Sequence, residues 1–163
     1  MEDRIQKAVE LFKSGYNCSQ SVVAAFADMY GFTQEQALRM GASFGGGIGR
    51  MRETCGAACG MFLVAGLETG ATEATDREGK AANYAVVQEL AAEFKKRNGS
   101  LICGELLGLK KKIPFQRFRK SVLLNIIASV LALKWWKKRQ EFGLNISKSI
   151  LNERKNAFLL QKR

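Results

Sequence analysis

ETCGAACG, residues 53–60, is the stretch on which the fold of this chain depends. Thr54 can cap a helix, which we expect to run from about Cys55 to Leu67. This helix carries a stripe of small residues, where another backbone or a ligand can come close because little side chain intervenes. The stripe consists of Gly56, Cys59, Gly60 and Gly66. We therefore expect other elements to pack tightly against this helix.

Helical patterns lie on both sides of this run. They cover residues 3–14, 18–30, 33–40 and 76–97, and no segment alternates like a strand. Asn17 and Thr33 are candidate N-caps, and a short last helix is expected after Ser100. The side chains expected to face the core are Ile5, Ala8, Val9 and Phe12 in the first helix, Val22, Val23, Phe26 and Met29 in the second, and Tyr84, Val87, Leu90, Ala91 and Phe94 in the longest. The predicted fold is all-α, a compact bundle of about five helices.

The composition changes at residue 110. Residues 1–109 hold all four cysteines and carry a net charge of −2, whereas residues 110–163 carry a net charge of +13. Fifteen of the sixteen glycines also precede residue 110. We therefore predict two parts, a cysteine-containing helical domain over residues 1–109 and a basic, partly apolar, helical extension over residues 110–163.

The chain contains no histidine, the residue that most acid–base, metal and nucleophile chemistry uses. Any chemistry is therefore expected from the cysteines. The N-terminus, MEDRIQ, lacks the apolar segment of a secretory signal. We predict a cytoplasmic protein, in which thiols stay reduced unless they are catalytic, redox-sensing or metal-bound.

Three cysteines fall at predicted helix starts: Cys18, Cys55 and Cys103. Free backbone N–H groups and the helix dipole stabilise a thiolate there, which lowers the pKa of a thiol from its usual value of about 8.5. Arg50 and Arg52 closely precede Cys55 and would act in the same direction. These positions predict reactive thiols, with Cys55 as the leading nucleophile or ligand and the other two as its partners.

Other interpretations of the cysteines stay open. Buried cysteine often serves as a small apolar filler without reactivity. Cys18, Cys55 and Cys103 could instead bind zinc or an iron–sulfur cluster, although the chain has no C-x-x-C pair. Cys55 and Cys59 share a helix face, but their Cβ atoms would be about 5–6 Å apart, whereas a disulfide requires about 3.5–4.5 Å.

A glycine-rich segment, GASFGGGIGR at residues 41–50, precedes the cysteine run. So many glycines disfavour helix and strand and predict an irregular turn. A phosphate-binding loop would need a preceding strand and a following Gly-Lys-Ser/Thr, and the sequence offers neither. We therefore interpret the segment as a tight turn that lets helices approach one another.

Four motifs together resemble one protein family: GYNCSQSV at residues 15–22, FGGGIGR at 44–50, CGAACG at 55–60 and NGSLICGELLG at 98–108. They resemble, over about residues 4–109, the redox-active proteins named for their cysteine pattern, C_GCAxxG_C_C. The resemblance implies a small helical protein with a cysteine redox function, related to oxidoreductase or transporter systems.

The resemblance also implies roles for particular residues. Cys18, Cys55 and Cys103 correspond to the first three family cysteines, and Gly56 and Gly60 lie in the CGAxxG element, where position 59 is variable. The family expects a fourth cysteine shortly after the CxELLG segment, and this chain has none after Cys103. The resemblance therefore implies a redox centre that lacks one of its thiols.

Residues 121–136, SVLLNIIASVLALKWW, form a strongly apolar run between basic segments. The run is short for a membrane span, which needs about 20 residues, but residues 119–139 could lie on an anionic membrane surface. A nucleic-acid partner rests on charge alone and is not expected. The joint loss of glycine, acidic residues and cysteine after residue 109 also fits a changed reading frame, which translation of the other two frames of the gene would test.

The sequence thus predicts a redox-active cysteine protein that works by thiol–disulfide exchange with an unidentified redox partner. A bound metal or iron–sulfur cluster is the competing form of the same centre. The alternative from another class is a non-enzymatic helical interaction module, with inert cysteines and a basic tail that docks to a membrane or an acidic partner. Fast alkylation of a native thiol would favour the redox centre.

Overall fold

The computed structural model describes residues 2–109 and 124–127 of the chain. Its elements are α1 (Glu2–Lys13), α2 (Cys18–Phe26), the 3-10 turn η1 (Ala27–Tyr30), α3 (Gln34–Gly41), the 3-10 turn η2 (Ala42–Phe44), α4 (Gly56–Thr69), α5 (Arg77–Asn98) and α6 (Cys103–Leu106). Residues 124–127 are also helical. The described residues contain no strand and only one isolated β-bridge, so the all-α prediction is confirmed.

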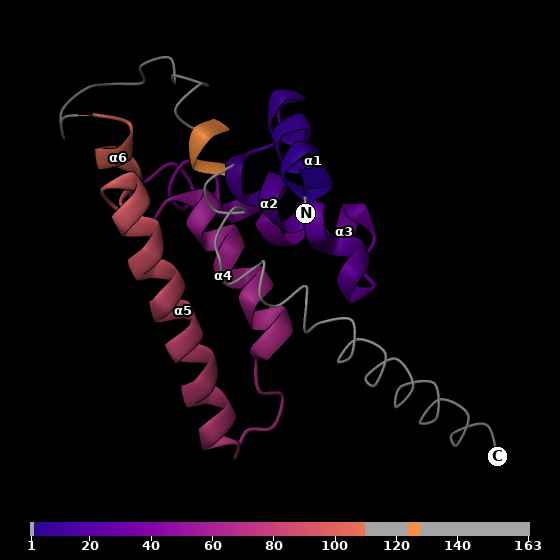
Figure 1. The fold of residues 1–163 in the computed structure, drawn as a ribbon. Coiled ribbons are helices and arrows are strands. Elements are labelled where there is room, and N and C mark those ends of the chain that lie inside the picture. The colour runs from indigo at the N-terminus through magenta and orange to yellow at the C-terminus, as the bar shows by residue number, and fades with distance from the viewer. Residues whose placement is uncertain (1, 110–123, 128–163) are drawn as a thin grey trace. The chain divides into compact units, whose positions relative to one another are not determined.

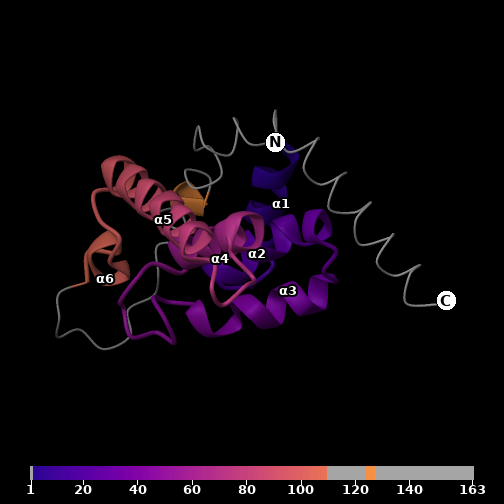
Figure 2. The same ribbon diagram turned by 90° about the horizontal axis from the view of Figure 1, so that it is seen from below.

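By its internal contacts the chain divides into Met1–Leu131 and Ala132–Arg163, and every described residue belongs to the first unit. Within that unit α2 is the central helix. It packs against α1, α3 and α4, and every residue of α2 except Gln20 is buried. Figure 1 shows α5 alongside α4, and Figure 2 shows the same neighbours from below.

Glycines of α4 allow α2 and the chain before α4 to approach it closely. A Cβ on Gly60 would lie 2.9 Å from the Cβ of Val22 in α2, and a Cβ on Gly56 would lie 2.6 Å from the carbonyl oxygen of Phe44. Among the described residues, no atom lies within 4 Å of the corresponding position on Gly66. The predicted small-residue stripe is therefore confirmed at its first two glycines and wrong at the last.

The predicted caps are confirmed where they depend on short-range hydrogen bonds. Asn17 and Thr33 both form capping boxes at the starts of α2 and α3. Thr54 does not cap α4, because Cys55 itself occupies the N-cap position and the helix begins at Gly56. Ser100 does not cap α6 either, since its hydroxyl accepts from the Ile102 N–H, one residue before the helix.

Two side chains expected in the core lie on the surface instead. Met29 is 41% exposed, because α2 ends at Phe26 and the following 3-10 turn changes the spacing of its side chains. Tyr84 is 62% exposed. The two buried residues of α5, Leu90 and Phe94, both lie in its C-terminal half, so its N-terminal half covers less of the core.

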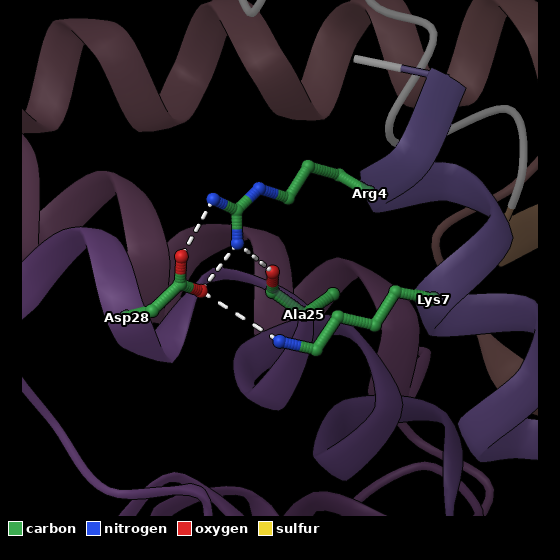
Figure 3. A network of polar contacts seen from close by, with 4 residues as sticks. All are labelled: Arg4, Lys7, Ala25 and Asp28. Atoms are coloured by element: carbon green, nitrogen blue, oxygen red, sulfur yellow. Dashed lines mark hydrogen bonds and ion pairs between the residues drawn. The ribbon is translucent and has the colours of Figure 1, made fainter.

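A charged network links α1 to the end of α2 (Figure 3). The Arg4 guanidinium donates to the Ala25 carbonyl at 2.7 Å and forms a bidentate ion pair with Asp28. Lys7 Nζ lies 3.6 Å from the same carboxylate. The hydrogen bond from Arg4 lowers the pKa of Asp28 to about 2. The guanidinium also lies 5.9 Å from the ring centroid of Phe26, within the range of a cation–π contact.

The described residues include no helix long and apolar enough to cross a membrane. Of the segment 119–139, which the sequence predicts to meet a membrane surface, only residues 124–127 are described. Within them Ile126 is 3% and Ile127 is 0% exposed. These two side chains therefore lie in protein rather than at the surface.

Candidate functional site

Cys55 and Cys103 are brought together by a short antiparallel pairing of backbone. Thr54 and Ile102 form an isolated β-bridge. The Cys55 N–H donates to the Leu101 carbonyl at 2.8 Å, and the Cys103 N–H donates to the carbonyl of residue 53 at 2.6 Å. Alternate residues of such a pair share a face, so the two cysteines are diagonal neighbours on one side of the pairing.

Cys18 joins this site through the packing of helix starts. It is the first residue of α2, directly after the cap Asn17. A Cβ on Gly56 would lie 3.4 Å from the Cys18 Cβ, so Cys18 packs against the first residue of α4. Asn17 Nδ2 donates to the Ala42 carbonyl at 2.9 Å. The start of α2 is thus enclosed by α4 and by the turn after α3.

The glycine-rich turn has a left-handed backbone. Each of residues 46–50 has φ between 54° and 75°, and Arg52 has φ 67°. Glycine adopts this conformation freely, but it costs other residues about 1–2 kcal/mol each. A Cβ on Gly47 would lie 2.5 Å from the Cys103 Cβ, so only glycine lets the turn lie against this thiol. The tight-turn interpretation is confirmed, and the turn also forms one wall of the cysteine site.

Cys59 is part of the same site, although the sequence predicted it only as a member of the small-residue stripe. Its Sγ lies 3.8 Å from the Thr54 carbonyl oxygen, to which the thiol donates. Cys55 and Cys103 both influence its ionisation. The sequence signal for this is the position of Cys59 one helical turn after Cys55, which places the two residues on one face of the helix. All four cysteines are free and buried, with exposed fractions of 5% at Cys18, 1% at Cys55, 8% at Cys59 and 3% at Cys103.

A comparison with known protein families matches residues 16–129 to the family described as "Putative redox-active protein (C_GCAxxG_C_C)". The match covers more than half of the chain and includes all four cysteines. The chain belongs to the C_GCAxxG_C_C family. No curated protein and no solved structure gives a significant match.

The family match continues past the change of composition at residue 110. It ends at residue 129 and so includes the buried Ile126 and Ile127. The first part of the basic extension is therefore similar in sequence to the C_GCAxxG_C_C family.

Burial controls the ionisation of the thiols in this C_GCAxxG_C_C protein. It raises the pKa of Cys18 to about 12 and that of Cys59 to about 11, and it also raises the pKa of Cys55 and Cys103. The prediction of lowered pKa values is therefore wrong. The expected helix-start effect exists at Cys55, where the N–H groups of Ala58 and Ala57 favour the thiolate, but loss of solvent outweighs it.

Arg52 acts on a different cysteine from the one the sequence predicts. Its side chain hydrogen-bonds to Cys103 and lowers the pKa of that thiol, against the larger effect of burial. Contrary to the prediction, neither Arg50 nor Arg52 is among the groups that shift the pKa of Cys55. The difference arises because the backbone pairing places Cys103, rather than Cys55, beside the Arg52 side chain. Among the described residues, Cys103 is therefore the thiol with a cationic partner.

A metal centre needs several ligands at nearly equal distances from one point. The part of the chain that the structure describes contains no group of three or more cysteine, aspartate or glutamate side chains arranged to hold a metal ion. The four thiols lie near one another without forming such a set of ligands.

Proposed function

We propose that this protein carries a two-electron thiol–disulfide centre in which Cys55 and Cys103 are the redox pair and Cys18 is a third thiol of the centre. The backbone pairing of residues 53–55 with residues 101–103 carries the proposal, because it holds these two thiols as neighbours. Membership of a family described as redox-active supports it. We also propose that it works in the cytoplasm, where a disulfide is formed and reduced in a cycle.

The separation of the pair suits a bond that opens and closes. Diagonal neighbours in an antiparallel pairing have Cα atoms about 7–8 Å apart, and a disulfide usually requires about 4.4–6.8 Å. A shift of about 1 Å would therefore close the bond. The structure has both thiols free, and oxidation would need only a local movement of the two paired segments.

The chemistry is an exchange with a disulfide on a redox partner. Cys103 loses its proton more readily than burial alone would allow, because Arg52 stabilises the thiolate. The Cys103 thiolate attacks one sulfur of the partner disulfide, which forms a mixed disulfide and releases one partner thiolate. The Cys55 thiolate then attacks the Cys103 sulfur, which closes the Cys55–Cys103 bond and releases the second partner thiolate. The protein loses two electrons and two protons, and the partner becomes a dithiol.

Access to Cys103 requires movement, since only 3% of the residue is exposed. Gly47 lies directly against its Cβ. We therefore expect the glycine-rich turn to move away when a partner reacts. The strained left-handed residues of the turn would lower the cost of that movement, because leaving the conformation relieves their strain.

One observation favours a second candidate function. All four thiols are buried, and burial raises the pKa of each, as is typical of inert cysteines in a structural role. On this alternative the protein is a helical interaction module whose basic extension docks to a partner. A cysteine-bound metal or iron–sulfur cluster is a third form that the same experiment can detect.

The test uses the full chain, purified without oxygen and equilibrated in dithiothreitol buffers of graded reduction potential. Trapped thiols are counted by intact mass, and linked peptides are identified after digestion. We expect a reversible loss of two thiols and a peptide pair joined through Cys55 and Cys103. Four thiols that stay reduced at every potential and alkylate slowly would establish the structural role. Stoichiometric iron or zinc in the same preparation would instead establish a metal centre.

A further inference from the structure

The fourth thiol of the site, Cys59, lies one helical turn after Cys55 and is directed toward the backbone that precedes α4. Its N–H donates to the Cys55 carbonyl at 2.9 Å. Its Sγ donates to the Thr54 carbonyl, whose carbon is bonded to the Cys55 nitrogen. The thiol is therefore directed back along α4 toward the Cys55 backbone, on the segment that pairs with residues 101–103.

We propose that Cys59 takes part in an internal disulfide exchange, in which its thiolate attacks the Cys55 sulfur of the Cys55–Cys103 disulfide. This inference rests on the proposed function, which supplies that disulfide. The Cys55–Cys103 bond breaks, the Cys55–Cys59 bond forms, and Cys103 leaves as a thiolate. Cys59 gives up one proton and Cys103 takes up one, so the exchange needs no further oxidant or reductant.

The backbone at Cys55 makes such a bond feasible. An estimate of about 5–6 Å between Cβ atoms applies when both residues are helical. Cys55 is instead the N-cap, with φ −55° and ψ 130°, and so lies outside the regular helix. Its Cβ can move toward Cys59 by the roughly 1–2 Å that a disulfide requires without breaking the helix.

The leaving group favours the exchange in this direction. A disulfide is cleaved faster when the departing thiol has a lower pKa. Arg52 lowers the pKa of Cys103 against the effect of burial. At 8% exposed, Cys59 is also the most exposed of the four cysteines. The exchange therefore moves the oxidised bond to a pair that includes the more exposed Cys59 and returns Cys103 to its reduced form.

Cys59 also supplies a thiol that this chain otherwise lacks. The pattern in the family name contains four cysteines, and this chain has no cysteine after Cys103. Cys59, one helical turn after Cys55, gives the centre a fourth thiol that precedes Cys103 in the sequence instead of following it.

The two disulfides can be distinguished by digestion with trypsin. Cleavage after Arg52, Arg77 and Arg97 leaves Cys55 and Cys59 in one peptide and Cys103 in another. A Cys55–Cys59 bond thus appears as one peptide that is two hydrogens lighter. A bond to Cys103 appears as two linked peptides.

The experiment oxidises the reduced full chain with diamide, stops the reaction with acid at successive times, blocks free thiols and maps the peptides. We expect linked peptides first, followed by growth of the light peptide with Cys103 becoming free. In Cys59→Ser, which keeps a hydroxyl to donate to Thr54, only the linked peptides should form. In Cys103→Ser the light peptide should form directly.

Two outcomes would overturn the proposal, and they have different meanings. If linked peptides form but Cys59 is always recovered as a free, blocked thiol, the internal exchange is wrong and the proposed redox pair stands. If no bond to Cys103 forms at any time, the proposed redox pair is wrong and the exchange falls with it. Mapping of the unmodified chain decides both points even if a variant fails to fold.

Discussion

Ser19 and Ser21 lie two residues apart in α2 and are both completely buried, but only one of their hydroxyls has a partner among the described residues. Ser21 Oγ donates to the Asn17 carbonyl at 2.9 Å. Ser19 Oγ has no hydrogen-bond partner among the described residues. A buried hydroxyl without a partner loses its hydration without compensation, whereas a paired one is close to balanced. The two serines therefore allow a matched comparison within one helix.

We expect Ser19→Ala to raise the free energy of unfolding by about 1 kcal/mol, because it removes an unsatisfied polar group. Ser21→Ala is the matched control and should lower it by about 1 kcal/mol. Urea denaturation followed by circular dichroism measures both. A loss of stability in Ser19→Ala as large as that in Ser21→Ala would contradict the absence of a partner.

Arg52 offers a second test at a single residue. Arg52→Gln removes the cation that favours the Cys103 thiolate, so the pKa of Cys103 should rise further. Each pKa unit reduces the thiolate fraction about tenfold, and we expect alkylation of Cys103 at pH 8 to slow by about three- to tenfold. Mass spectrometry of the Cys103 peptide after timed iodoacetamide treatment measures the rate.

The control for this prediction is Arg50→Gln, which removes one positive charge from the same left-handed turn. Arg50 is not among the groups that shift the pKa of Cys103. Its substitution should leave the alkylation rate of that thiol nearly unchanged. Equal slowing in both variants would mean that net charge, rather than the Arg52 contact, acts on the thiol.

The sequence could indicate which cysteines form the site, but not which side chains lie beside each of them. Cys18 was correctly placed at a helix start because Asn17 caps α2 through groups only three residues away. The pairing of Thr54 with Ile102 joins segments that are far apart in the chain, and no local pattern reports it. That pairing decides that Arg52 meets Cys103, so the charge partner of the site could not be predicted.

At the scale of elements, Gly60 and Gly66 of α4 differ in how closely other atoms approach them. Gly60→Ala would place a Cβ 2.9 Å from Val22 Cβ and 3.0 Å from the Ser19 carbonyl oxygen. We expect a loss of about 1–3 kcal/mol from overpacking. Gly66→Ala meets no atom of the described residues within 4 Å and should gain up to about 1 kcal/mol, because alanine favours helix. Thermal and urea unfolding compare the two, and a loss in both would mean that helix approach is not the cause.

The ion pair between α1 and the end of α2 predicts a dependence on pH. Arg4 lowers the pKa of Asp28 to about 2, so the carboxylate stabilises the folded protein fully above its ordinary pKa near 4. This stabilisation is lost as the pH falls from about 4 through about 2. Because the Asp28 side chain is 59% exposed, Asp28→Asn should cost only about 0.5–1 kcal/mol at pH 7.

Urea denaturation of both proteins at pH 7 and at pH 2 or below measures this difference. The gap between Asp28→Asn and the unmodified chain should shrink at the lower pH. A gap of constant size would show that the substitution acts through something other than the charge of the carboxylate.

Elements were predicted best where their signals are local. The capping boxes at Asn17 and Thr33 are complete within four residues each, and both helices begin where expected. The inward position of Tyr84 depends instead on which part of α5 other helices cover. That is a property of the assembled bundle, and helical spacing alone cannot supply it.

At the scale of the whole molecule, the change of composition at residue 110 does not coincide with the end of the family match. The match to the C_GCAxxG_C_C family continues to residue 129. The described residues beyond 110 include the fully buried Ile127. Both observations favour a genuine continuation of the domain over a changed reading frame at that point. Translation of the other two frames remains the direct test, and a frame with a cysteine and balanced charge would reverse this interpretation.

Ile127 tests whether the basic half of the chain stabilises the fold. Truncating a fully buried isoleucine removes apolar contacts and leaves a cavity, so we expect Ile127→Ala to lower the free energy of unfolding by about 2–5 kcal/mol. Leu67→Ala is the control, since Leu67 is 38% exposed and exposed substitutions usually change stability by less than about 0.5 kcal/mol. Equal urea midpoints for Ile127→Ala and the unmodified chain would mean that the residues after 110 add nothing to the core.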